Sequence, residues 1–170
     1  LGRFEAAERN LRLAHEELTN ELGASAEESL LTGLDLGSVL ATAGRIDEAA
    51  SLIDACLAAA RTHLGPDHLV TLRAEHELGC ARCLGGDWPA AEPHLLRAVE
   101  GRARALGELD RNTLASRGML GYLRSEQDRG DEAEVLLEAT LAGQRQVLGE
   151  DHPDTLTTLG MMSKKWCEEN

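Results

Sequence analysis

The 170 residues are 42% hydrophobic but only 2% aromatic, so leucine and alanine supply nearly all of the apolar surface. That composition favours closely packed helices and argues against a β-sandwich or barrel, which draws on β-branched and aromatic residues. The net charge of −13 argues against nucleic acid and anionic membranes as partners, because both are bound through clustered cations, and no apolar run is long enough to span a membrane.

One period organises the whole chain. The dipeptide Leu-Gly recurs every 42 residues, at 22–23, 64–65, 106–107 and 148–149. Three further registers keep the same spacing, and their members are Ala7, Ala49, Ala91 and Ala133; Leu11, Ile53, Leu95 and Leu137; and Leu30, Leu72, Leu114 and Leu156. A fixed period of this size predicts stacked supersecondary units rather than one globular core.

Each period reads as two helices, a first-type helix and then a second-type helix. Apolar spacing, glycine stops and acidic caps predict, in chain order, helices over 3–21, 26–42, 46–63, 68–84, 88–105, 110–127, 131–147 and 152–168. Short connections make neighbouring helices antiparallel, and hairpins that cannot bury their apolar faces alone must stack. The predicted fold is all-α, a right-handed α-solenoid of stacked antiparallel helix pairs.

The sequence begins and ends with half of a repeat, since its first helix is of the second type and its last helix is of the first type. Both ends should therefore expose a stacking face, with Phe4 and Leu11 marking the front, and Leu159, Met162 and Trp166 marking the rear. We expect residues 1–170 to be a single array of three full repeats with a half repeat at each end. The missing initiator methionine indicates a piece of a longer protein.

The motif Leu-Gly-Glu-Asp-His-Pro-Asp-Thr-Leu at 148–156, its relative at 64–72 and the turn at 44–49 resemble the 42-residue tetratricopeptide repeats of the kinesin light chain type. The resemblance covers the whole chain. It implies a non-enzymatic scaffold whose concave groove, lined by the first helix of each pair, binds a protein or peptide. We expect no cofactor. In bacteria such repeats are common in multidomain proteins, joined to kinases or signalling ATPases, and the composition suits a high-GC bacterial genome.

Alignment on Leu36-Gly37, Leu78-Gly79 and Leu120-Gly121 selects the groove positions that the resemblance implies. The expected partner-binding residues are Leu31, Asp35, Ser38, Arg73, His76, Glu77, Cys80, Met119, Tyr122, Glu126, Met161 and Lys164. The family usually carries asparagine where this chain has two carboxylates and two thioethers, at 35, 77, 119 and 161. The groove is therefore expected to be acidic at the front and apolar at the rear, which favours a partner with Lys or Arg near an apolar anchor.

Two charged residues, Glu75 and Arg117, stand in a register where the family has leucine. Either they pair across the repeat interface, or both reach solvent. The histidines at 15, 63 and 94 are expected at the surface. His68 and His152 fall in the turns between repeats, where Asp67 and Asp151 are expected to cap the next helix.

Cys80 and Cys83 have the spacing of a metal or redox pair, and His76 lies one helical turn before them. A structural zinc site needs four ligands, and no second close pair is visible, so the motif is weak. Four cysteines without a disulfide framework indicate a reducing compartment and hence the cytoplasm.

Three hypotheses remain. The first is a non-catalytic interaction scaffold within a larger signalling or regulatory protein. The second is a self-assembly module that stacks through its exposed terminal helices. The third is an enzyme or metal site around His76, Cys80 and Cys83.

Overall fold

The structure is a computed structural model that describes the backbone of residues 2–168 and the side chains of residues 5–162. Within this part the chain forms eight α-helices. They are α1 (Gly2–Leu22), α2 (Glu27–Thr42), α3 (Ile46–His63), α4 (Leu69–Leu84), α5 (Trp88–Leu106), α6 (Arg111–Glu126), α7 (Gly130–Val147) and α8 (Pro153–Glu168). Each predicted helix is present, and its ends agree with the prediction to within one residue.

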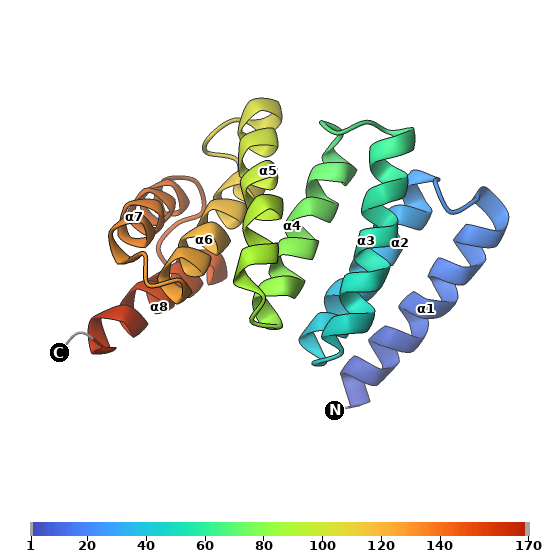
Figure 1. Ribbon diagram of the computed structural model, residues 1–170, viewed down its shortest axis with the longest axis horizontal. Coiled ribbons are helices and arrows are strands. Elements are labelled where there is room, and N and C mark those ends of the chain that lie inside the picture. The colour runs from blue at the N-terminus through green and yellow to red at the C-terminus, as the bar shows by residue number, and fades with distance from the viewer. Residues whose placement is uncertain (1, 169–170) are drawn as a thin grey trace. The chain divides into compact units, whose positions relative to one another are not determined.

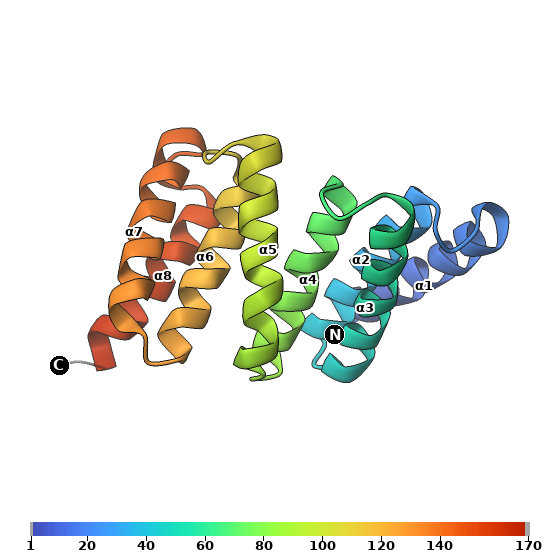
Figure 2. The same cartoon turned by 45° about the horizontal axis from the view of Figure 1, so that its top comes forward.

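The chain divides into two compact units, Leu1–His94 and Leu95–Asn170, and the division falls inside α5. In the first unit α3 packs against both α2 and α4, while α1 packs against α2 and α2 against α4 (Figures 1 and 2). Aliphatic side chains fill the space between these helices, and those of Leu34, Ile53, Leu57 and Leu78 are at most 1% exposed.

The second unit repeats this arrangement, with α7 packed against α6 and α8, and α6 against α8 (Figure 1). Its core is again aliphatic and includes Leu114, Leu123 and Leu137. Small residues complete it, since Ala133 is fully buried. Both units therefore consist of antiparallel helix pairs that bury leucine and alanine, as the composition predicts.

The recurring Leu-Gly dipeptide ends every second-type helix. Its glycine has a φ between +93° and +96° in all four repeats, a conformation that side chains with a Cβ rarely adopt. At Gly149 the backbone N–H donates to the carbonyl of Gln144 at 3.2 Å, which closes the end of α7. The 42-residue spacing of the Leu-Gly dipeptides is therefore the spacing between the ends of successive second-type helices.

Glycine in the other recurring dipeptide has a different role. A Cβ on Gly37 would lie 2.5 Å from Cγ1 of Ile53, and one on Gly121 would lie 2.9 Å from Leu137. Each glycine therefore lets a first-type helix approach its second-type partner closely, and this contact explains why Leu36-Gly37 and Leu120-Gly121 recur.

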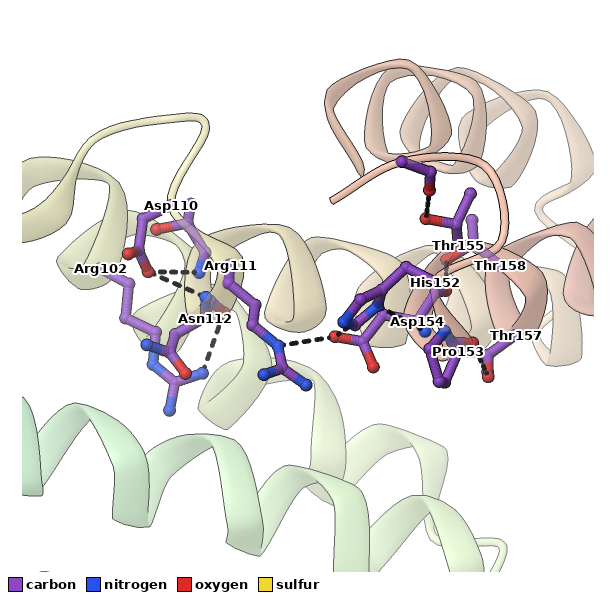
Figure 3. Close-up of polar contacts among 12 residues, drawn as sticks. Arg102, Asp110, Arg111, Asn112, His152, Pro153, Asp154, Thr155, Thr157 and Thr158 are labelled. Carbon is purple, nitrogen blue, oxygen red and sulfur yellow. Dashed lines mark hydrogen bonds and ion pairs between the residues drawn. The ribbon is translucent and has the colours of Figure 1, made fainter. Parts of the chain in front are cut away.

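Three of the first-type helices, α4, α6 and α8, begin with a side-chain cap, and two of these caps are visible in Figure 3, whereas α2 begins at Ala26 without one. At the start of α6 the Asp110 carboxylate accepts hydrogen bonds from the backbone N–H groups of Asn112 (2.8 Å) and Thr113 (3.4 Å). At the start of α8, Nδ1 of His152 accepts from the N–H of Asp154 at 3.1 Å. Each cap satisfies a donor that has no partner within the helix.

The capping role expected of Asp67 and Asp151 was wrong by one residue. The N-cap of α4 is His68, whose Nδ1 accepts from the N–H of Val70 at 3.3 Å, just as His152 serves α8. An imidazole nitrogen can accept at this position as a carboxylate oxygen does. Both histidines are therefore structural parts of the turn between repeats.

In two of these turns between repeats, a threonine hydroxyl forms a further hydrogen bond to the backbone. Oγ1 of Thr155 donates to the carbonyl of Gly149 at 2.8 Å, and Oγ1 of Thr71 donates to that of Gly65 at 2.7 Å. In these two turns the Leu-Gly glycine and the threonine six residues later belong to one hydrogen-bonded turn, whereas the buried hydroxyls of Ser29 and Thr113, at the same position of the other two turns, have no hydrogen-bond partner. In addition, none of the helices among the described residues combines the length and apolar character of a membrane span.

Candidate functional site

The expected groove positions of the first unit lie on α2 and α4, which pack against each other. All of them are half-buried, so they border the core without belonging to it. Those on α2 are Leu31, Asp35 and Ser38, and those on α4 are Arg73, His76, Glu77 and Cys80.

A cluster of three charged side chains joins the two helices. The Arg73 guanidinium is hydrogen-bonded and ion-paired to the Asp35 carboxylate, and its Nε lies 3.9 Å from Oε1 of Glu77. The side chains of Asp35, Arg73 and Glu77 are 48%, 32% and 18% exposed, so solvent reaches all three. The Arg73 guanidinium thus lies between the carboxylates of Asp35 and Glu77. It makes this surface less acidic than was predicted from the two carboxylates.

His76 and Cys80 lie one helical turn apart on α4. The Cys80 Sγ is 3.5 Å from Nε2 of His76, while Cys83 is 4% exposed and buried in the core. The two cysteines whose spacing resembles that of a metal or redox pair therefore occupy different environments. Among the described side chains, no group of three or more His, Cys, Asp or Glu residues is arranged to hold a metal ion.

In the second unit the expected positions lie on α6 and α8. Met119, Tyr122 and Glu126 of α6 and Met161 of α8 are each half-buried. Lys164 falls outside the described side chains. The two methionines share one register, 42 residues apart, on helices that pack against each other.

A further ion pair joins the beginnings of α6 and α8. Nε of Arg111 lies 2.9 Å from Oδ2 of Asp154, as Figure 3 shows. Arg73 and Asp35 form a comparable ion pair between α4 and α2 in the first unit, so an ion pair joins adjacent first-type helices in each unit. Both pairs are partly exposed, and exposed pairs contribute at most about 1 kcal/mol each, so they orient side chains more than they stabilise the fold.

A buried charge that sequence reasoning misplaced lies on the other side of α4. The Glu75 carboxylate is 2% exposed, accepts a hydrogen bond from Arg61 of α3, and lies 2.7 Å from Nδ1 of His94. The alternative that Glu75 reaches solvent is therefore wrong. The expectation that His94 lies at the surface is also wrong, because its side chain is only 18% exposed. Arg117, its expected partner, is ion-paired with Glu108.

A buried guanidinium in the second unit was also missed. Arg102 of α5 is 6% exposed. Its Nη1 donates to the carbonyl of Asn112 at 3.0 Å, a contact drawn in Figure 3, and also donates to Oγ of Ser116 at 2.7 Å. Sequence reasoning could not find this contact, because its printed partners are a backbone carbonyl and a serine hydroxyl of the next helix, which no charge pattern in the sequence indicates.

Comparisons with known proteins agree with this architecture. Models of the tetratricopeptide repeat match residues 27–104 and 113–154. No curated protein matches the sequence.

Solved structures match over nearly the whole chain. Two belong to a proposed kinesin light chain of Podosopora anserina with nearly identical TPR-like repeats, one of them a variant. They give TM-scores of 0.78 and 0.76 at 23% identity, covering 98% of this chain and 78% and 79% of theirs. BtubC (BKLC) from P. vanneervenii gives a TM-score of 0.81 at 21% identity, covering 98% of this chain and 66% of its own.

At these identities the structural likeness establishes the fold, an all-α solenoid of stacked antiparallel helix pairs, as predicted. Tetratricopeptide repeats generally mediate protein–protein interaction and are generally non-catalytic. The two family models together match most of the sequence. The chain belongs to the tetratricopeptide repeat family.

Proposed function

We propose that the chain is a non-catalytic interaction scaffold that binds a peptide or partner segment on the faces of its first-type helices. The observation that supports this proposal is the accessibility of the eleven described groove positions. All are half-buried, and ten of them lie on α2, α4 and α6, helices that also contribute buried residues to the core. Such side chains are already partly ordered and remain open to a ligand on one side, which lowers the entropic cost of binding.

The chemistry of the two faces defines the ligand class. In the first unit, the carboxylates of Asp35 and Glu77 both lie near the Arg73 guanidinium, so these three side chains together have a net charge of −1, which favours a cationic ligand. In the second unit Met119, Tyr122 and Met161 offer adaptable and aromatic apolar surface. The proposed ligand is therefore a segment with Lys or Arg and an apolar anchor.

Peptide display tests this proposal. Random 12-residue peptides are selected on the wild-type chain, and the affinity of the enriched peptides is measured by fluorescence polarisation for the wild type and for the double variant Asp35→Lys/Glu77→Lys. We expect enrichment of Lys or Arg with an apolar residue, and an affinity loss of at least about tenfold in the variant, equivalent to ~1.4 kcal/mol.

The matched control is Asp54→Lys/Glu138→Lys, which makes the same change in net charge at exposed positions of the second-type helices α3 and α7. It should change affinity less than about twofold if binding is local, because exposed charges more than about 10 Å from a ligand are largely screened at physiological salt. An equal loss in both variants, or no enriched peptide class, would contradict the groove proposal. Thermal unfolding of each variant confirms that it is folded.

A second candidate function, self-assembly, is favoured by residues in two registers. Leu30, Leu72 and Leu114 are at most 2% exposed, but Leu156 in the same register is 53% exposed. Ala7 of α1 is likewise half-buried where its equivalents are fully buried. In this alternative α1 of a second copy, a second-type helix, covers α8. Phe4 and Trp166, which were expected to mark these faces, lie outside the described side chains.

Sedimentation equilibrium separates the two candidates. Self-assembly predicts a mass that rises with concentration and returns to that of a monomer in Leu156→Glu. A monomer at all concentrations removes this candidate and leaves peptide binding unaffected.

The setting is also part of our proposal. We place the chain in the bacterial cytoplasm, as a single array within a larger signalling or regulatory protein. Cysteine usage supports a reducing compartment, because Cys56, Cys80 and Cys83 are thiols. Identification of the source gene, and fractionation of cells that express it, test this placement.

A further inference from the structure

One side of α1 is half-buried at positions that belong to the core in other second-type helices. Apolar residues recur on this side every three or four positions and form the front stripe, which consists of Ala7, Leu11, Ala14 and Leu18. Their equivalents in α3 and α7, each at most 5% exposed, are Ala49, Ile53, Cys56 and Ala60, and Ala133, Leu137, Thr140 and Gln144. α1 packs against α2 through the adjoining side, where the ring of His15 lies close to Gly33. The front stripe is therefore open to a further helix.

The other repeats show what kind of helix fits such a stripe. The same side of α3 is covered by α2, and that of α7 by α6. Both covering helices bring glycine to the contact. A Cβ on Gly33 would lie 2.7 Å from Sγ of Cys56, and one on Gly121 would lie 2.9 Å from Leu137. An amphipathic helix with small residues three or four positions apart therefore fits the front stripe, because only small residues allow so close an approach.

Glu17 distinguishes the front stripe from the equivalent sides of the other second-type helices. The residues in its register are Ala59, Gly101 and Gly143. A small residue is needed in α7, since a Cβ on Gly143 would lie 2.7 Å from Cδ2 of Leu114 in the covering helix. The Glu17 side chain is exposed and is larger than any of these. A leucine that faced it as Leu114 faces Gly143 would collide with it and would remove water from its carboxylate without replacing the hydrogen bonds.

We propose that the front stripe of α1 binds an amphipathic helix of a partner protein, and that this helix carries Lys or Arg opposite Glu17. A long cationic side chain can reach the carboxylate from the position that leucine occupies in the covering helices of this chain. Glu21, one helical turn further along α1, is also exposed and adds to the negative potential. Neither carboxylate forms an ion pair with another described side chain. The front stripe lies on a second-type helix, so this proposal does not rest on peptide binding by the first-type helices.

The same register argues against a second copy of the chain as the occupant. The first-type helix that another copy could offer is α8, and its residue in the register of Leu114 is Leu156. In a head-to-tail contact Leu156 would face Glu17, so the carboxylate that favours a basic partner helix hinders self-assembly. Self-assembly and the partner helix are therefore competing uses of α1.

The test uses a helix that is known to fit this kind of stripe. The probe is a fluorescein-labelled peptide with the sequence of residues 109–128, which contains α6, carrying Leu114→Lys. Its binding to the 170-residue chain is measured by fluorescence polarisation, beside the unchanged peptide and a Leu114→Glu peptide. We expect the Leu114→Lys peptide to bind at least about tenfold more tightly than the Leu114→Glu peptide, because close interfacial charge pairs couple this strongly.

Variants of the chain locate the site. Leu11→Glu should abolish binding, whereas the matched change Leu13→Glu, at a 54% exposed position on the opposite side of α1, should change affinity less than about twofold. Glu17→Lys should reverse the preference, so that the Leu114→Glu peptide binds more tightly, and Glu16→Lys, the same charge change at an exposed position on the opposite side, should not. Circular dichroism checks that each variant is folded.

Three results would overturn the proposal. The first is equal binding, or none, for the three peptides. The second is a preference that Glu17→Lys leaves unchanged, a variant that alters only an exposed side chain and leaves the packing of α1 intact. The third is self-association of the wild-type chain in sedimentation equilibrium that is lost in Leu11→Glu, because a second copy would then occupy the front stripe.

Discussion

Replacement of the glycine that ends α7 measures what the 42-residue period contributes to stability. Gly149 has a φ of +94°, and a Cβ built on it would meet no atom within 4 Å. The cost of Gly149→Ala therefore comes from the backbone conformation alone. That strain is about 2 kcal/mol for a residue with a Cβ. The smaller entropy of alanine in the unfolded chain offsets about 0.7 kcal/mol, so we expect a net loss of about 1.3 kcal/mol.

The chain supplies a matched control eleven residues later. Gly160 lies within α8, has no positive φ, and would also place its Cβ in open space. Gly160→Ala changes the unfolded chain equally but meets no strain, so it should stabilise the protein by about 0.7 kcal/mol. The difference between the two variants, about 2 kcal/mol, isolates the backbone strain at Gly149.

Urea unfolding followed by circular dichroism measures both changes, with the slope of free energy against denaturant checked for constancy. In thermal unfolding, the melting temperature of Gly149→Ala should fall by roughly 3–5 °C, since 1 kcal/mol corresponds to about 2–4 °C at this chain length. Equal effects of the two variants would refute the reasoning, because they would show that the positive φ at the Leu-Gly dipeptide carries no strain.

Two more predictions concern charged groups. Glu75→Leu should change the free energy of unfolding by less than about 1 kcal/mol, because leucine fills the site without a desolvation penalty. Glu75→Ala should cost about 2–4 kcal/mol, because it leaves a cavity. Equal losses of the two variants in urea unfolding would show that the ion pair itself dominates. Hydrogen bonds from Arg12, the larger effect, and from Arg45 hold the pKa of Glu8 below its usual 4.5. The stabilisation from the ionised Glu8 is therefore complete above the unfolded-state pKa and is lost as the pH falls through the lower folded-state pKa. Carboxyl NMR titration should show the pKa of Glu8 rising toward 4.5 in Arg12→Met, and an unchanged value would contradict this assignment.

The expected groove residues could be selected from the sequence because they are tied to the repeat. Once Leu36-Gly37 fixes the register of a first-type helix, the positions next to the core follow from the helical spacing. Asp35 and Met119 lie on first-type helices and are half-buried. Their partners could not be read in the same way, since Arg73 reaches Asp35 across 38 residues of sequence.

Caps and buried charges were the weakest part of the sequence reasoning. A capping acid was expected at Asp67, but the N-cap falls on His68, because the boundary of α4 lies one residue further along the chain. Glu75 was expected to pair with Arg117 or to reach solvent, yet it is buried with Arg61 and His94. Periodicity says where a residue lies on its helix, but not which long side chain reaches it.

The sequence alone determined the repeat, the eight helices and their stops, because each depends on local requirements: apolar spacing for one helical face, and glycine for a positive φ at the Leu-Gly dipeptides. Only the tertiary structure decided that Cys80 faces His76 while Cys83 is buried, and that Arg73 lies between two carboxylates. These features depend on side-chain rotamers and on contacts between helices distant in sequence. The 42-residue period cannot encode them, because they differ from one repeat to the next.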